Sequence, residues 1–171
     1  MAVVLQAFQG IQTFTITSLN SLASSLTAGW SSAAVDNSSA LYLDAFVQVN
    51  LAAVPTTAPA SLKAIYVYAY GLTDPAGTAY TTTGVASGTP GTQGALTFPD
   101  ITANPVNLPL IGIVPYLTTN LAINSAPMSV AKGFGGWMPQ KWGIAIINAT
   151  GVTIAASGNA VQYTGIYNTV V

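Results

Sequence analysis

Apolar and polar residues alternate most regularly over Leu41–Leu51. Leucine, alanine and valine hold every second position, while Asp44, Gln48 and Asn50 fall between them together with two aromatic residues. Side chains of a strand point alternately to opposite faces, so this period of two predicts a β-strand with one face turned into a core. Clean alternation of this kind is typical of antiparallel sheets.

The same period predicts strands elsewhere in the chain. Ile11–Thr17 alternates with β-branched residues, and Leu62–Tyr70 alternates with tyrosines on one side. Three leucines of Ser18–Thr27 have helical spacing, yet the Ser and Thr content there is equally compatible with a loop or a bulged strand. Weaker candidate strands lie in Gly29–Ser39, Thr78–Val85, Val106–Leu117 and Asn120–Ala131.

Residues that favour turns separate these segments. Glycine and proline in particular break regular structure and form tight turns. Connections are therefore predicted at Val54–Ser61, Gly71–Gly77, Ala86–Ala95 and Gly133–Pro139.

The last segment, Lys141–Val171, predicts three short strands. A buried run at Ile144–Ile147 comes first, an alternating stretch at Val152–Ala156 comes next, and a final strand follows. Turns between them are predicted at Asn148–Gly151 and Ser157–Asn159, because Gly and Asn tolerate positive φ. Short strands joined by tight turns predict an antiparallel meander.

Together these patterns predict an all-β fold, an antiparallel β-sandwich, because turn signals recur about every ten residues. Within this class we favour an eight-stranded jelly roll, since Gly84–Phe98 is long enough to cross between sheets; an immunoglobulin-like sandwich is the alternative. We expect an N-terminal arm, residues 1–10, followed by a single β-sandwich domain, residues 11–171.

Charge is scarce in this chain of 171 residues. It has four Asp or Glu and three Lys or Arg, so 4% of its residues are charged, against roughly 25% in ordinary domains. The mean hydropathy is +0.54. A nearly neutral surface has little repulsion to keep copies apart, and excess apolar surface is commonly covered by a partner. We therefore expect self-association.

No segment predicts a membrane span or a secretory leader. A span needs about 20 apolar residues, and the best run, Val106–Leu117, is broken by Pro109 and Pro115. Met1–Gly10 lacks the basic start of a signal peptide. The chain also lacks the positive charge that attracts phosphates, so we expect neither a membrane nor a nucleic-acid partner.

Catalytic side chains are almost missing, because the chain has no His and no Cys and its four Asp are dispersed. Ser129 and Lys132 fit the S-x-x-K spacing of penicillin-recognising enzymes. The segment is predicted as a strand, however, which would place the two side chains on opposite faces. We interpret the spacing as a chance match and predict no enzyme activity and no catalytic residue.

Metal and cofactor sites are not predicted either. Only oxygen ligands remain, which suit calcium, but Asp36-Asn37-Ser38 is more typical of an Asx turn. Gly133–Gly136 lacks the Lys-Ser/Thr and the helix of a phosphate loop and predicts a tight turn. Glycosylation sequons at Asn37 and Asn148 are expected by chance at this Ser and Thr content.

Tyr66, Tyr68 and Tyr70 fall on one face of the strand predicted at Leu62–Tyr70. Exposed, such a row of rings would be a platform for sugars. Buried, it would belong to the core or to a subunit contact, where tyrosine is favoured for its apolar ring and polar tip. We favour the buried interpretation and keep a carbohydrate-binding module as the alternative function.

A set of Gly-, Trp- and Asn-containing segments recurs at both ends of the chain: Gly29–Ser32, Asp36–Asn37, Leu41–Asp44, Gly135–Pro139, Lys141–Ile144, Asn148–Gly151 and Tyr163–Ile166. Through these segments, about half of the chain resembles jelly-roll cement or decoration proteins of tailed bacteriophages. It implies a structural virion protein on the capsid exterior that bridges major capsid subunits, often as a dimer or trimer. A tail- or fibre-associated module is a further alternative. Contact elements would be Met1–Gly10, Ala86–Ala95 and Gly133–Pro139.

Overall fold

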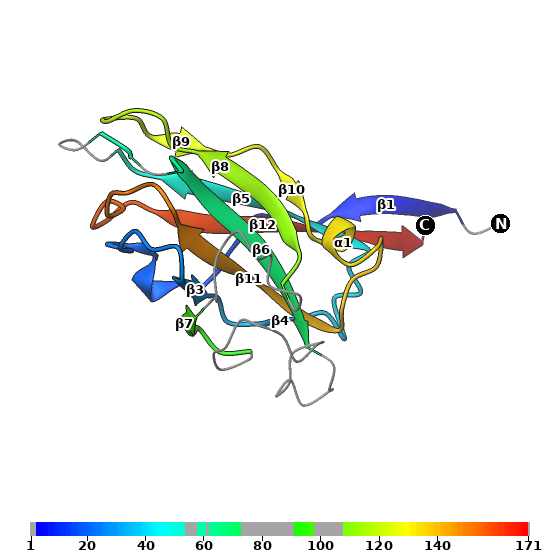
Figure 1. Cartoon of the computed structure of the whole chain (residues 1–171). Helices are drawn as coiled ribbons and strands as arrows, with labels where there is room; N and C mark the ends of the chain where they lie inside the picture. The colour runs from blue at the N-terminus through cyan, green and yellow to red at the C-terminus, as the bar shows by residue number, and fades with distance from the viewer. Residues whose placement is uncertain (1–2, 54–57, 61, 73–90, 98–107, 171) are drawn as a thin grey trace.

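The structure is a computed structural model that describes residues 3–53, 58–60, 62–72, 91–97 and 108–170. These residues form two antiparallel sheets that pack face to face (Figure 1). The predicted fold class, an all-β antiparallel sandwich, is thereby confirmed. The weak strand predicted at Thr78–Val85 lies outside the described residues.

Each of the two sheets contains six of the described strands. The first has the order β1–β12–β5–β10, formed by β1 (Val4–Phe8), β12 (Ala160–Val170), β5 (Asp44–Leu51) and β10 (Met128–Ser129), with β2 (Gln12–Thr13) beside β12 and β9 (Ile123–Asn124) beside β5. The second has the order β7–β3–β11–β6–β8, formed by β7 (Gly94–Thr97), β3 (Ala28–Ser31), β11 (Lys141–Asn148), β6 (Ala64–Leu72) and β8 (Leu110–Pro115), with β4 (Val35–Asp36) beside β11. Two short helical turns, η1 (Thr17–Leu19) and α1 (Val130–Gly133), complete the described elements.

The strand pairs are nested. β1 pairs with β12, β3 with β11, β5 with β10 and β6 with β8, all antiparallel. Among the described strands, none pairs with the strand that follows it in the chain. Every main pair therefore joins segments that are not consecutive in the chain, and the chain crosses repeatedly between the two sheets.

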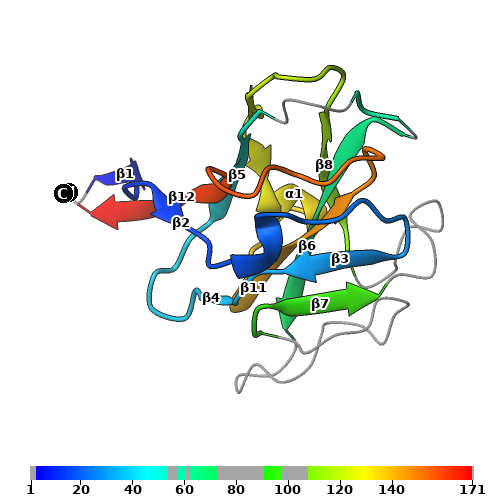
Figure 2. The ribbon, with the colours of Figure 1, turned by 90° about the vertical axis from the view of Figure 1, so that its left-hand side faces the viewer.

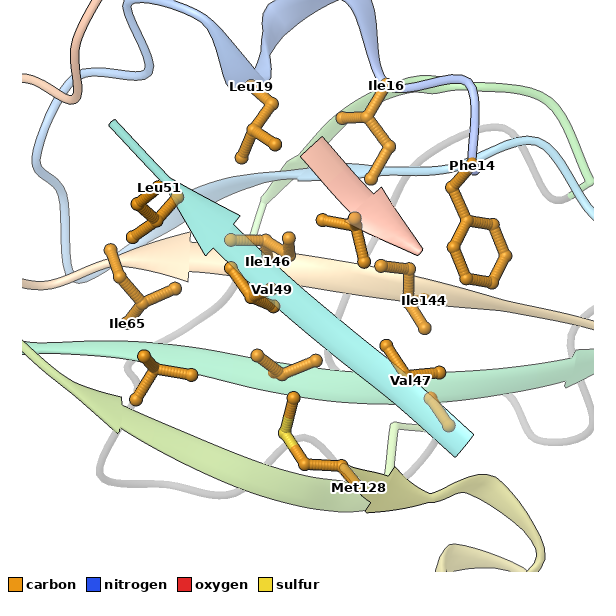
Figure 3. Close-up of a cluster of buried hydrophobic side chains, with 14 of the residues drawn as sticks. Phe14, Ile16, Leu19, Val47, Val49, Leu51, Ile65, Met128, Ile144 and Ile146 are labelled. Atoms are coloured by element: carbon orange, nitrogen blue, oxygen red, sulfur yellow. The ribbon is translucent and has the colours of Figure 1, made fainter. Parts of the chain in front are cut away.

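The main core lies between the two sheets. Val47 and Val49 of β5 face Ile144 and Ile146 of β11, and all four side chains are fully buried (Figure 3). Burying an aliphatic side chain of this size stabilises a fold by about 1.5–3 kcal/mol. The alternation predicted for Leu41–Leu51 is confirmed in β5, where every second residue is buried.

A second, smaller core covers the other face of β6 and β11. It contains Tyr68, Tyr70, Leu96, Leu108 and Ile147, all at most 2% exposed. Both faces of these central strands are therefore buried, which explains the unbroken apolar run in β11. The strand predicted at Leu62–Tyr70 is confirmed and continues to Leu72, into the segment predicted as a turn.

The predicted C-terminal meander is wrong. β11 and β12 lie in different sheets, and the middle strand predicted at Val152–Ala156 is not a strand. Val152 and Ile154 are nevertheless buried while their neighbours Gly151 and Thr153 are exposed. The alternation thus arises from a connection that inserts every second side chain into the core, because periodicity reports burial rather than strand pairing.

Three other strand predictions need correction. In Ile11–Thr17 only β2 is a strand, although Phe14 and Ile16, which share one face of the predicted alternation, are both buried in the core. Asn120–Ala131 contains two short strands and the start of α1 instead of one continuous strand, since Pro127 cannot donate a ladder hydrogen bond. Ala86–Ala95, predicted as a loop, is described only from Gly91 and contains the start of β7.

Candidate interaction surface

β1 and the end of β12 form a two-stranded ribbon that projects from the sandwich (Figures 1 and 2). β12 pairs with β5 from Ala160 to Ile166, and with β1 from Ile166 to Val170. Beyond Ile166, β1 is therefore the one described partner of β12. The residues predicted as an N-terminal arm thus include an edge strand of the first sheet.

Exposed apolar side chains cover this ribbon. Val4, Phe8 and Val170 are 60%, 59% and 66% exposed, and Leu5 is 48% exposed. Neither β1 nor β12 contains Asp, Glu, Lys or Arg. Natural edge strands usually carry charges or proline that prevent pairing with other chains, and β1 has neither. Unprotected apolar surface of this kind marks a site of interaction.

The base of the ribbon is fixed by Tyr42. Its ring packs against Gly165, where a Cβ atom would lie only 2.5 Å from Tyr42 Cδ1, and its hydroxyl donates to Gln9 Oε1. Burial and the neighbouring Tyr167 raise the pKa of Tyr42. An open pocket of about 210 Å³ is lined by Gln9, Ala40, Tyr42 and Tyr167. The ribbon is thus held firmly where it leaves the body.

Two loops, residues 37–43 and 134–140, lie next to the ribbon. In the first loop, Leu43 donates its N–H to the Ile166 carbonyl oxygen at 2.7 Å. The two loops are joined by Asn37, which donates its N–H to the carbonyl oxygen of Gln140 at 2.7 Å. The buried Asn37 side chain holds the first loop by bonding both backbone groups of Tyr42. The ribbon and the two loops therefore form one end of the sandwich.

Large apolar side chains protrude from both loops. Leu41 is 69% exposed at a φ of +51°, and Leu43 is 49% exposed. Trp137 is 58% exposed and its ring lies 6.0 Å from that of Phe134. We call the surface formed by Val4, Leu5, Phe8, Val170, Leu41, Leu43 and Trp137 the apolar end.

Asp44 holds the Trp137 loop in place through α1. Its Oδ2 accepts a hydrogen bond from Ser129 Oγ at 2.7 Å, and its Oδ1 accepts from the N–H of Ala131 at 2.9 Å. Ser129 Oγ in turn accepts from the N–H of Lys132 and caps the helix. The carboxylate thereby joins the start of β5 to α1 and to the loop that follows.

The S-x-x-K residues do not lie as predicted. Ser129 and Lys132 flank one helical turn rather than opposite faces of a strand. The helix forms because Asp44 and Ser129 satisfy its first N–H groups. The serine hydroxyl serves as the N-terminal cap of this helical turn, a role that the sequence analysis did not predict. The turn predicted at Gly133–Gly136 is confirmed, with positive φ at Gly135 and Gly136.

The tyrosine row is not an exposed platform. Tyr68 and Tyr70 are fully buried in the second core, and Tyr66 is half-buried. The Tyr70 hydroxyl donates to the Ser32 carbonyl oxygen at 2.8 Å. Burial raises the pKa of Tyr68 to about 12. The interpretation as core residues is confirmed for Tyr68 and Tyr70.

The polar candidate residues have structural roles. Asp36 Oδ1 accepts from the N–H of Ser38 at 2.8 Å, which is the predicted Asx turn, and bonds from Ser38 lower the pKa of Asp36. The Asn148 amide is fully buried and donates to the Leu22 and Val152 carbonyl oxygens. Both sequon asparagines, Asn37 and Asn148, therefore have buried, hydrogen-bonded side chains.

Within residues 3–53, 58–60, 62–72, 91–97 and 108–170, no three His, Cys, Asp or Glu lie close enough to hold a metal ion. Among the same residues, no helix has the length and hydropathy needed to cross a membrane.

Sequence reasoning named two elements of the apolar end, residues 1–10 and 133–139, but missed Leu41 and Leu43, which it placed inside a strand. A signal was available for the ribbon alone: residues 1–35 and 142–171 contain no Asp, Glu, Lys or Arg, whereas Leu41 and Leu43 lie between Asp36 and Asp44. Comparison with protein-family models, curated proteins and solved structures finds no match.

Proposed function

We propose that the chain is a structural virion protein of a tailed bacteriophage, a cement or decoration protein on the capsid exterior that bridges major capsid subunits. The observation that carries the proposal is the apolar end: seven large apolar side chains protrude from one end of a rigid sandwich. Such a surface suits a protein partner, because the buried centre of an interface is apolar and a few anchors, tryptophan among them, provide most of its binding energy. The resemblance in sequence supplies the kind of partner.

The strand order supports a jelly roll as the finer description of the fold. A jelly roll is one long antiparallel hairpin rolled into two sheets, so its first strand pairs with its last and its second with the one before the last. β1–β12, β3–β11, β5–β10 and β6–β8 follow this nested scheme. β7 adds to the edge of the second sheet beside β3. Jelly rolls are common in viral capsid proteins.

The chain would stabilise the capsid by burying apolar surface against its subunits and by binding only the assembled shell. A protein that binds only the assembled shell stabilises that shell in proportion to the logarithm of its concentration above the dissociation constant. Trp137 and Leu41 are the natural anchors, since each would bury most of an exposed side chain against a capsid subunit. With so few ionic groups, this binding should depend little on salt.

The test uses DNA-free heads of the virus that encodes the chain, assembled without it. We expect the purified chain to co-sediment with heads and to raise their melting temperature in calorimetry. Trp137→Ser should weaken binding at least tenfold with unchanged folding. The matched control is Leu117→Ser, because Leu117 is 60% exposed but follows β8 at the opposite end of the sandwich.

Two outcomes would contradict the proposal. Failure of the folded chain to bind heads would exclude the cement function, and binding to tails alone would assign it to the tail instead. Equal loss of binding in Trp137→Ser and Leu117→Ser would show that the apolar end is not the contact.

A further inference from the structure

We propose that β1 pairs edge to edge with β1 of a second copy of the chain, across a two-fold axis at Gln6, so that the first sheet continues through a dimer. The dimer deepens the proposed function, because it rests on the expectation that this structural protein acts as an oligomer. It does not depend on the capsid as partner.

The hydrogen-bond pattern shows which groups of β1 are free to pair. The Gln9 N–H donates to the Gly165 carbonyl oxygen, in the same register that pairs Ala7 with Tyr167 and Leu5 with Thr169. In an antiparallel ladder, residues alternate between those bonded to the partner and those facing away. Backbone groups of the residues between these, Val4, Gln6 and Phe8, therefore point to the outer edge, where no described strand pairs with them.

These three residues can pair with the same three residues of a second copy. When Gln6 lies opposite Gln6 of the second copy, Val4 lies opposite Phe8 of that copy, and Phe8 opposite its Val4. All three pairs are then of the bonded type, so the register places every free N–H of this edge against a carbonyl oxygen. Aromatic rings opposite β-branched residues are favourable cross-strand pairs. Side-chain amides of the two glutamines meet on the axis.

A second copy fits this edge better than an unrelated chain. A two-fold contact uses the same patch twice, and antiparallel pairing of identical strands has this symmetry. Nothing opposes it electrostatically, because residues 1–35 contain no charged side chain. Six apolar residues of the ribbon and its surroundings are each 48–67% exposed: Val3, Val4, Leu5, Phe8, Ile11 and Val170. At roughly 100 Å² for each side chain, they present on the order of 350 Å². This is somewhat under half of the roughly 800 Å² that each partner buries in a standard interface.

The ribbon also needs such a neighbour. An isolated two-stranded ribbon is marginally stable in water, and three or more strands are needed for independent stability. Pairing of two copies would convert two projecting ribbons into one four-stranded sheet with the order β12–β1–β1–β12. The loops that carry Leu41 and Trp137 are not part of this edge and stay available for the shell.

The first experiment measures the chain alone, without heads. We expect sedimentation equilibrium to give a dimer at micromolar concentration and Gln6→Lys to give a monomer, because it places two like charges on the axis. Gln6→Pro is a second variant: it removes an N–H that faces the edge and leaves the bonds to β12 intact. Circular dichroism checks that both variants stay folded.

The second experiment tests the register by disulfide formation, which is clean because the chain has no cysteine. Gln6→Cys should form an intermolecular disulfide on oxidation, since Cα atoms of a bonded antiparallel pair lie about 5.5 Å apart. Val4→Cys and Phe8→Cys should cross-link when mixed but not separately. Ser157→Cys, on an exposed turn before the other end of β12, is the control and should not cross-link.

The inference would be overturned if the wild-type chain stayed monomeric at 100 times the micromolar concentration of the first experiment. It would also be overturned if Gln6→Cys formed disulfide-linked dimers no faster than Ser157→Cys. A dimer that persists in both Gln6→Lys and Gln6→Pro would also overturn it. Binding of the wild-type chain to heads is measured separately from dimer formation. The proposed function can therefore stand when this inference fails.

Discussion

At the scale of single residues, two glycines of the central strands lie beneath tyrosine rings. Gly143 in β11 lies under the ring of Tyr70, and Gly165 in β12 lies under the ring of Tyr42. In each case the ring occupies the space that a Cβ atom would need. The two rings are held in place by hydroxyl hydrogen bonds, to Ser32 and to Gln9.

Replacing Gly143 with alanine should therefore destabilise the protein by about 1–3 kcal/mol, the usual cost of overpacking a core. The new Cβ would lie 2.5 Å from Tyr70 Cε1 and displace the ring. Gly94→Ala is the matched control: it is also a strand glycine of the second sheet, with nothing within 4 Å of the added atom. Urea unfolding measures both. Equal midpoints would mean that Tyr70 moves aside freely.

At the scale of elements, the short α1 depends on contacts from outside itself. Four residues are too few to form a stable helix alone, because nucleation is unfavourable. Asp44 and Ser129 bond the first N–H groups of α1 and fix it to the start of β5. The position of Trp137 is thus set by a carboxylate more than 90 residues earlier in the chain.

Asp44→Ala should cost about 2 kcal/mol, since it removes the hydrogen bonds that the carboxylate accepts from Ser129, Ala131 and Ala45 and leaves the Ala131 N–H without its acceptor. Amide hydrogen exchange over residues 130–138 should accelerate more than exchange in β11. Asp36→Ala is the control, with a smaller loss expected, because Asp36 is exposed and bonds only within its own turn. If exchange over residues 130–138 were unchanged in Asp44→Ala, the carboxylate of Asp44 would not position the Trp137 loop.

For the whole molecule, the absence of histidine and cysteine determines how stability responds to pH. No side chain of the chain has an ordinary pKa between about 5 and 8. Burial raises the pKa values of Tyr42, Tyr68 and Tyr163, that of Tyr68 to about 12. Bonds from Ser38 lower the pKa of Asp36 below 3.8.

We therefore expect the free energy of unfolding to stay nearly constant from about pH 5 to pH 9. A tyrosine whose pKa is raised by folding stabilises the protein fully below the unfolded value of 10.0, and this contribution is lost as the pH rises toward 12. Asp36 acts in the opposite direction, and its contribution is lost as the pH falls through 3.8 and below. Chemical unfolding at a series of pH values, with tyrosinate absorbance, measures this. A steep change near pH 7 would contradict it.

The sequence by itself determined the fold class and the burial of most segments. Alternation in residues 41–51 identified β5, and the apolar run Ile144–Ile147 identified β11, since these patterns follow from which faces meet water. The scarcity of charge led us to expect self-association, which stays a prediction.

Only the tertiary structure decided which strands pair and where the exposed apolar residues gather. Backbone hydrogen bonds are the same for every residue, so the pattern that marks a strand does not name its partner. The residues around Val152 alternate like a strand and belong to a connection, and β1 finds its partner more than 150 residues away. The ribbon and the apolar end exist because the first and last strands of a nested fold meet at one edge.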